Sequence, residues 1–182
     1  MTSRYTGIFS LCLAIFLSAH TALTATQPSD RAIGFGTTQA TVTILSSNLA
    51  NGATIGEWGL SALVEVDERC VLFDTGRHPD TVLRNAQALD VDLTCVTDVV
   101  LSHHHFDHTS GLHPLLGALK AQNPRAGLRV HVAEGFFLHR QRPDTGETER
   151  NQMISLRNTL EDAGVEFIEH AGPAEILPTV WV

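Results

Sequence analysis

The stretch VTDVVLSHHHFDH, residues 96–108, decides how this chain is interpreted. Its first half, residues 96–102, is apolar and β-branched, which is typical of a buried strand. Its second half, residues 103–108, contains four histidines and one aspartate. Imidazole and carboxylate groups are the ligands that zinc and similar divalent metals prefer. We therefore predict a metal site at the end of this strand, in preference to a solvated histidine-rich loop.

If residues 103–108 continue the strand, their side chains point alternately to its two faces. Alternate side chains of an extended segment face the same way, so His103, His105 and Asp107 share one side. His104 faces the opposite side, and His108 requires a turn. A helical alternative pairs His104 with His108 at four-residue spacing. The strand-like residues before the cluster and the glycine after it disfavour this alternative.

Two metal arrangements follow from this division. In a two-metal site, His103 and His105 bind one ion, Asp107 and His108 bind a neighbouring ion, and a bridging water becomes acidic. In a one-metal site, His103 and His105 bind the ion while Asp107 orients the water or carries its proton. The one-metal version makes Asp107 the catalytic candidate. The expected cofactor is zinc, as one or two ions, with iron or manganese as alternatives. The remaining histidines of the mature chain are isolated in sequence, and we expect surface or core positions for them: His78, His113, His131, His139 and His170.

Composition narrows the classes of partner. The 182 residues carry 12 Lys and Arg against 20 Asp and Glu, a formal net charge of −8. Such a chain has no electrostatic footprint for nucleic acid or for an anionic membrane surface, so we expect a small-molecule substrate and no nucleic acid. The length suits a single domain.

The N-terminus predicts export. Arg4 is the only charge before Asp30, and residues 7–19 are apolar but too short for a comfortable membrane span. Small residues follow, so residues 1–25 are interpreted as a signal peptide, 26–38 as a flexible lead-in and 39–182 as the folded domain. The expected location is periplasmic or secreted, with no stable span after cleavage. An uncleaved membrane anchor is the alternative.

Strand and helix patterns interleave along the folded part. β-Branched runs predict strands at 40–45, 60–66, 70–73, 96–102, 128–133, 165–168 and 174–182. Helical spacing of apolar residues predicts helices at 79–89, 111–121 and 149–163. Because the early strands are joined by hairpin turns, we expect a mixed sheet in an α/β fold of the α+β type. Cys70 and Cys95 adjoin two of the strands, and either two buried thiols or a disulfide fits them.

The cluster and its flanks together resemble a known family. Residues 103–108 match the HxHxDH signature of the metallo-β-lactamase-fold superfamily. The resemblance extends to GLSALVE at 59–65, FDTG at 73–76 and HTSGL at 108–112. It covers roughly residues 40–120 and is similar to the branch that contains dihydropterin synthases and many uncharacterised hydrolase-like proteins.

The resemblance implies an αββα sandwich with a metal site at the edge between its sheets. It assigns His103 and His105 to one metal and Asp107 and His108 to a second, with Asp74 nearby as a residue that orients a ligand. The implied activity is metal-dependent hydrolysis of an ester, lactone, amide or phosphoester. A non-catalytic metal-binding module of the cell envelope and a pterin-related synthase are the alternatives.

Departures from the family pattern lie mostly after the cluster. The superfamily completes its site with later histidines and a bridging aspartate, and no residue after His108 has that context. His170 precedes Ala-Gly-Pro, His104 stands where relatives often have glycine, and Trp58 replaces a residue that is often polar. The chain also ends inside an apolar run at 174–182. We therefore expect it to be the N-terminal half of the fold, incomplete at its C-terminus.

Overall fold

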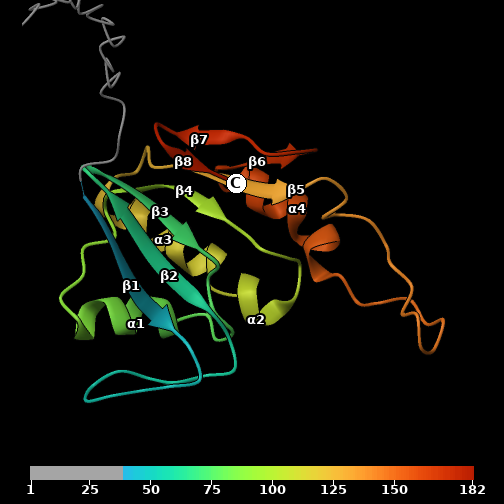
Figure 1. Ribbon diagram of the computed structural model, residues 1–182, viewed down its shortest axis with the longest axis horizontal. Helices are drawn as coiled ribbons and strands as arrows, with labels where there is room; N and C mark the ends of the chain where they lie inside the picture. The colour runs from blue at the N-terminus through green and yellow to red at the C-terminus, as the bar shows by residue number, and fades with distance from the viewer. Residues whose placement is uncertain (1–38) are drawn as a thin grey trace, which may run out of the picture. The chain divides into compact units, whose positions relative to one another are not determined.

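The computed structural model describes residues 39–182. The predicted signal peptide and lead-in, residues 1–25 and 26–38, lie outside the described residues. Figure 1 shows a main sheet of six strands, β1 (Ala40–Ser46), β2 (Ser61–Val66), β3 (Arg69–Phe73), β4 (Val96–Val100), β5 (Leu128–Ala133) and β6 (Val165–His170). A separate pair of short strands follows, β7 (Glu175–Leu177) and β8 (Val180–Trp181). The helices are α1 (Thr81–Ala88), α2 (Phe106–Thr109), α3 (Leu112–Gln122) and α4 (Gln152–Asp162).

The main sheet is mixed, as expected, and its strands lie in chain order. β1, β2 and β3 are antiparallel neighbours, whereas β3, β4, β5 and β6 are all parallel. The change of direction follows from the connections. A tight turn joins β2 to β3, with Asp67 at φ 53°, while each later strand is reached through a helical crossover, as parallel pairing requires. The ends of the parallel strands therefore meet at one edge of the sheet.

The hydrophobic core lies between the sheet and the three longer helices. Leu63, Leu72, Val99 and Val130 point from four neighbouring strands into this core and are fully buried. The helices contribute the other side: Val82 and Ala86 from α1, Leu115, Leu116 and Leu119 from α3, and Met153 and Leu160 from α4. Each buried leucine of this kind contributes about 1.5–3 kcal/mol. This packing fixes the strand ends that carry the histidines.

The opposite face of the sheet is also apolar. Val42 and Ile44 of β1 are 59% and 51% exposed. Farther along the same face, a cavity of about 700 Å³ opens between the sheet and the β7–β8 pair. Its lining includes Val71, Phe73 and Trp181. The sheet is thus covered by helices on one face only, as far as residues 39–182 are concerned.

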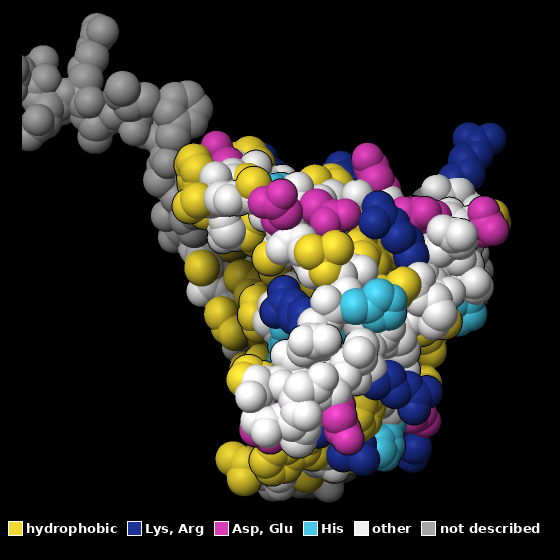
Figure 2. All heavy atoms as spheres, turned by 90° about the vertical axis from the view of Figure 1, so that its right-hand side faces the viewer, with side chains coloured by type: hydrophobic (Ala, Val, Ile, Leu, Met, Phe, Trp, Pro, Cys, Tyr) yellow, Lys and Arg dark blue, Asp and Glu magenta, His cyan; other side chains and the backbone are white. Residues whose placement is uncertain are grey.

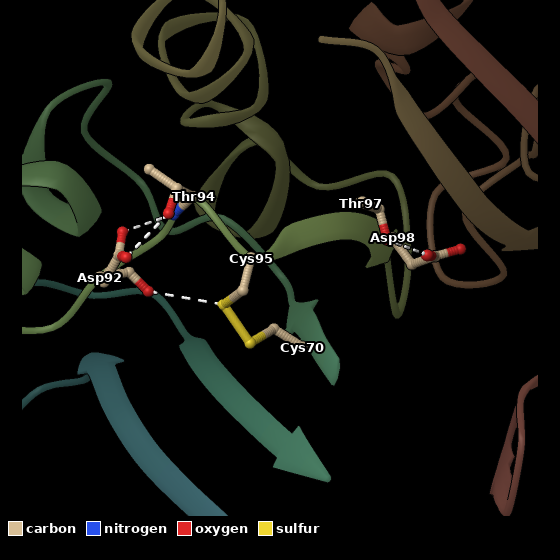
Figure 3. The surroundings of a disulfide bond; sticks show 6 residues. All are labelled: Cys70, Asp92, Thr94, Cys95, Thr97 and Asp98. Atoms are coloured by element: carbon tan, nitrogen blue, oxygen red, sulfur yellow. Dashed lines mark hydrogen bonds between the residues drawn. A yellow bond between two sulfur atoms is a disulfide. The ribbon is translucent and has the colours of Figure 1, made fainter. Parts of the chain in front are cut away.

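A disulfide joins Cys70 of β3 to Cys95, the residue before β4 (Figure 3). The bond closes the crossover that contains α1, over a sequence separation of 25 residues. Figure 3 also shows the turn before the bridge, where Asp92 accepts hydrogen bonds from the backbone and hydroxyl of Thr94. Of the two states that the sequence allows, the structure contains the disulfide.

Three local predictions were wrong. α4 begins at Gln152 rather than at residue 149, because Asn151 caps it by accepting a hydrogen bond from the Met153 N–H at 3.0 Å. The terminal run 174–182 forms two short strands instead of one, with a turn at Thr179 (φ 69°). The strand predicted over 96–102 ends two residues earlier, because β4 stops at Val100, and the helical turn α2 follows from Phe106. Within residues 39–182, every helix is too short or too polar to cross a bilayer.

Candidate metal centre

The histidine cluster lies in the connection between β4 and α3. The chain leaves β4 after Val100 and bends at residues 102–104, and His105 then precedes α2 with φ −65° and ψ 145°. Asp107 and His108 then lie in the single helical turn of α2. The turn that the sequence requires for His108 is this helical turn, which begins at Phe106. Because His104 precedes the helix, the alternative pairing of His104 with His108 along one helix is not present.

The first group of candidate ligands consists of His103, Asp107 and His108, and we call it the HDH group. One ligand atom from each residue lies within 4.8 Å of the other two. His108 Nε2 is 3.6 Å from Asp107 Oδ2, and all three side chains are partly buried. Two imidazoles and a carboxylate at this spacing fit a divalent cation.

Asp74 holds the HDH group in place through hydrogen bonds to His108 and to Ser102. Its side chain is fully buried and accepts hydrogen bonds from His108 Nδ1 at 2.7 Å, Ser102 Oγ at 2.7 Å and Ser102 N at 2.8 Å. Because the Ser102 hydroxyl proton goes to Asp74, Ser102 Oγ accepts from His103 Nδ1 at 3.0 Å. Both His103 and His108 are thus protonated at Nδ1. In this tautomer the lone pair of each ring lies on Nε2, where a metal ion can bind.

The second group consists of His104, His105 and Glu149, and we call it the HHE group. Its ligand atoms also lie within 4.8 Å of one another. His105 Nε2 is 2.5 Å from Glu149 Oε1, and His104 Nε2 is 3.7 Å from Glu149 Oε2. The sequence pairs His103 with His105. The structure brings their rings to 4.5 Å between centroids but places His105 against Glu149.

The local environment shifts the pKa values of three of these side chains, His103, His104 and Glu149. Burial lowers the pKa of His103, and the neighbouring His108 and His105 lower it further. Burial also lowers the pKa of His104, although Glu149 opposes this shift. The hydrogen bond with His105 holds the pKa of Glu149 below its usual value. These shifts favour the neutral form of the His103 and His104 rings and the ionised form of the Glu149 carboxylate.

Both groups border one cavity of about 710 Å³. Its lining includes His104, His105, Asp107 and Glu149, together with Phe106, Ser110, Arg142, Glu147, Thr148, Arg150 and Gln152. Trp58, which departs from the family pattern, is 68% exposed and is not among these lining residues. Figure 2, which views the molecule from the right-hand side of Figure 1, shows basic, acidic and histidine side chains interspersed over this face.

Sequence reasoning missed a second carboxylate–histidine network in the middle of the sheet. Asp98 is fully buried and accepts hydrogen bonds from Arg129 Nε at 2.8 Å and His131 Nε2 at 2.9 Å. His131 Nδ1 in turn lies 2.9 Å from His170 Nε2. Both histidines line the cavity under β7 and β8 rather than the one at the HDH group. Polar residues inside apolar strand patterns, paired by the β4–β5 register, are the signal that identifies this network.

Glu149 is the second residue that sequence reasoning missed. It lies 41 positions after His108, at the first residue of the segment that the sequence predicts as a helix. Its position depends on the fold of the loop before α4, where Glu149 N donates to Arg140 O at 2.7 Å. No local motif reveals such a long-range contact.

Comparisons with known proteins agree with this geometry. The family model described as the metallo-beta-lactamase superfamily matches residues 59–179, which contain both ligand groups. A 7,8-dihydropterin-6-methyl-4-(beta-D-ribofuranosyl)-aminobenzene-5'-phosphate synthase from Methanocaldococcus jannaschii is 34% identical over 70 residues, covering 36% of this chain and 24% of that protein. An uncharacterised protein from the same organism is 34% identical over 71 residues, covering 39% and 27%.

A solved structure gives the same result for the fold. A metal-dependent hydrolase of the beta-lactamase superfamily is 27% identical with a TM-score of 0.53, over 77% of this chain and 46% of that one. The chain therefore spans about a quarter of the length of the curated relatives and under half of this structure. The predicted α/β fold and family resemblance are both confirmed. The family model matches residues 59–179, about two thirds of the chain. This match shows that the chain belongs to the metallo-beta-lactamase superfamily.

Proposed function

We propose that this chain carries the metal-binding part of a hydrolase that activates water for attack on a small molecule. The observation that supports the proposal is the HDH group with its anchor. Asp74 orients His108 directly and His103 through Ser102, so that His108 Nε2 lies 3.6 Å from Asp107 Oδ2 and one ligand atom of His103 lies within 4.8 Å of both residues. Such outer hydrogen bonds are the usual support of a functional metal site.

The residues divide the chemistry between them. When bound, a zinc ion lowers the pKa of a coordinated water towards neutrality and polarises the bond under attack. His103, Asp107 and His108 would hold the ion, with His105 as a further ligand in the two-metal version. Asp107 is the candidate for receiving or holding a proton of the attacking water. Iron or manganese also suits this ligand set.

The cavity supports a small-molecule substrate. A volume of about 710 Å³ falls within the usual range for ligand pockets. The substrate class that we propose is an ester, lactone, amide or phosphoester. The similarity to a solved structure described as a metal-dependent hydrolase supports hydrolysis as the reaction class.

We also propose that the protein works outside the reducing cytosol. The Cys70–Cys95 disulfide supports this location, because such bonds persist in oxidising compartments. The N-terminal sequence pattern supports it independently.

Metal analysis beside a substrate panel tests the proposal. The purified full chain is assayed for bound zinc, iron and manganese and for hydrolysis of ester, lactone, β-lactam and phosphodiester substrates. We expect the His103→Ala/His105→Ala double variant to lose bound metal and turnover together. His113→Ala, which removes an exposed imidazole from α3, is the matched control and should keep both.

Two outcomes contradict parts of the proposal. Normal metal content in the double variant would show that the ligands are assigned wrongly. Metal that is retained by the wild-type chain without turnover of any substrate would favour the non-catalytic metal-binding module instead.

A pterin-related synthase is the second candidate, favoured by the 34% identity to the archaeal synthase over 70 residues. Calorimetric titration with a dihydropterin separates the two candidates. Binding that depends on His103 and His105, in the absence of any hydrolysis, would favour the synthase.

A further inference from the structure

We infer that the HHE group, His104, His105 and Glu149, is a second divalent-cation site beside the HDH group. The family resemblance assigns no ligand role to His104 or Glu149. The inference rests on the proposed function only in that both groups border one cavity, and its test measures bound metal rather than turnover.

The geometry of the group is close to that of a metal site. The ligand atoms of a tetrahedral zinc ion lie about 3.3 Å apart, as bond lengths near 2.0–2.1 Å require. Here the Glu149 oxygens lie 2.5 Å from His105 Nε2 and 3.7 Å from His104 Nε2, on either side of that value. The carboxylate thus spans the two rings with one oxygen towards each. Side-chain movements of about 1 Å would complete the site.

The strongest single observation is the buried Nε2 of His104. The residue is 4% exposed, and this nitrogen has no hydrogen-bond partner among the described residues. Buried polar atoms without a protein partner are uncommon, and a bound ion or water is a recognised reason for them. The atom lies within 4.8 Å of the His105 and Glu149 ligand atoms, so it points into the group rather than into the core.

The loop that carries Glu149 is held in place by its own backbone. Glu149 N donates to Arg140 O at 2.7 Å, and Arg142 N donates to Glu147 O at 2.8 Å. Gln141 and Thr148 form a β-bridge between these two contacts. The carboxylate therefore reaches the histidines from a closed hairpin, which reduces the ordering cost of binding an ion.

The donor set selects the class of cation. Two imidazole nitrogens and one carboxylate oxygen suit zinc, cobalt or iron, whereas magnesium and calcium prefer oxygen ligands throughout. A water or a substrate atom would complete the coordination from the cavity. His105 lies between the two groups, with its ring 4.5 Å from that of His103 and 5.0 Å from that of His104.

Cobalt titration of the metal-free full chain tests the site. Chelator-treated protein is titrated with Co²⁺, and bound metal is counted by mass spectrometry of the eluted protein and by visible absorption. We expect two Co²⁺ per wild-type chain. Glu149→Gln and His104→Phe should each bind one, with affinity for the second ion at least about 100-fold weaker, since even outer-shell substitutions weaken binding 10–100-fold.

The controls separate this site from the HDH group. Glu147→Gln removes a carboxylate from the same cavity lining and should still bind two ions. Asp107→Asn should lose the other ion and keep the one that depends on Glu149. Circular dichroism confirms that each variant is folded, and Glu149→Gln tests the inference alone if His104→Phe does not fold.

Two results would overturn the inference while leaving the proposed function intact. One is a wild-type stoichiometry of a single ion that Asp107→Asn removes. The other is unchanged binding of two ions in Glu149→Gln. Conversely, loss of an ion in Glu149→Gln without any change in Asp107→Asn would support the HHE site and contradict the assignment of Asp107 as a ligand.

Discussion

Asp74 and Asp98 are both fully buried, and each accepts a hydrogen bond from a histidine ring. Asp98 also accepts two hydrogen bonds from Arg129, so a cation within the sheet compensates its charge. Asp74 receives its other hydrogen bonds from Ser102, and no Lys or Arg among residues 39–182 forms a salt bridge with it.

This difference separates a structural carboxylate from one that is ready for a metal. A buried negative charge is costly unless it is paired. Arg129 meets that requirement for Asp98 at all times. For Asp74, compensation comes through His108, either when that ring is protonated or when its Nε2 contacts a bound cation. The same Asp–His pair therefore stabilises the sheet at one position and supports ligand binding at the other.

The largest effect is expected from breaking the compensated pair. Asp98→Asn should lower the free energy of unfolding by about 3 kcal/mol, the low end of the range for broken buried ion pairs, because Arg129 is half-exposed. Urea denaturation measures the change. Asp80→Asn, in an exposed pair with Arg84, is the control and should cost less than about 1 kcal/mol. Equal losses of unfolding free energy in Asp98→Asn and Asp80→Asn would show that the buried pair stabilises the fold no more than an exposed pair does.

Asp74→Asn should act mainly on metal affinity. We expect Zn²⁺ binding to weaken 10–100-fold, because Asn no longer fixes the tautomers of His108 and His103. Competition with a chromogenic chelator measures it. Asp98→Asn should leave this affinity within a few-fold of wild type in the fraction that remains folded, and a large loss there would contradict the separation of roles.

The next effect in size is expected from the pH dependence of stability, to which Asp98 contributes. Burial would raise the pKa of Asp98, but hydrogen bonds from Arg129, His131 and Thr97 outweigh it and lower the pKa below its usual value. A depressed pKa stabilises the fold above the unfolded value of about 3.9, and this contribution is lost as pH falls through the folded pKa. Unfolding free energies measured from pH 6 to pH 3 should therefore decline.

The decline should be shallower in Asp98→Asn but should not vanish. Glu57 contributes in the same direction, because hydrogen bonds from Ser46, Arg77, His78 and Thr81 outweigh burial and lower its pKa. Combining Asp98→Asn with Glu57→Gln should flatten the curve further. An identical slope in wild type and Asp98→Asn would contradict the titration of Asp98 in this range.

The smallest effect is expected at the outer end of the Asp98 network. His170→Ala removes the partner of His131 Nδ1, which borders the cavity under β7 and β8. Water can replace this bond, so the loss in unfolding free energy should be under about 1 kcal/mol. Thermal unfolding measures it. A loss as large as that of Asp98→Asn would show that the three residues act as one unit.

Much of the fold was predictable because its signals are local. β-Branched runs and helical spacing identify the main-sheet strands and the three longer helices within a few residues, and the turn at Asp67 indicates the β2–β3 hairpin. The sequence predicts the start of α4 three residues too early, because the residue that caps the helix is Asn151 and the charged residues before it lie outside the helix. Local pattern also located the cluster at 103–108.

The remaining features depend on contacts between distant segments. Glu149 meets His105 across 44 positions, and Asp98 meets Arg129 across 31. Strand alternation places His103 and His105 on one side, but the bends at residues 102–104 and the helical turn from Phe106 bring His103 to Asp107 and His108 instead. Which ligands share an ion therefore depends on backbone geometry that periodicity does not encode.

The Cys70–Cys95 bridge makes residues 70–95 a covalent ring. Asp74 lies inside the ring and His108 outside it, so the hydrogen bond that links them crosses from one topological part of the chain to the other. A single cut of the backbone at the exposed residues after α1, near Asp90, would leave the two pieces joined by the disulfide in one covalent molecule. Reduction of the bridge would then divide that molecule into two fragments, with the anchor on one and the metal ligands on the other.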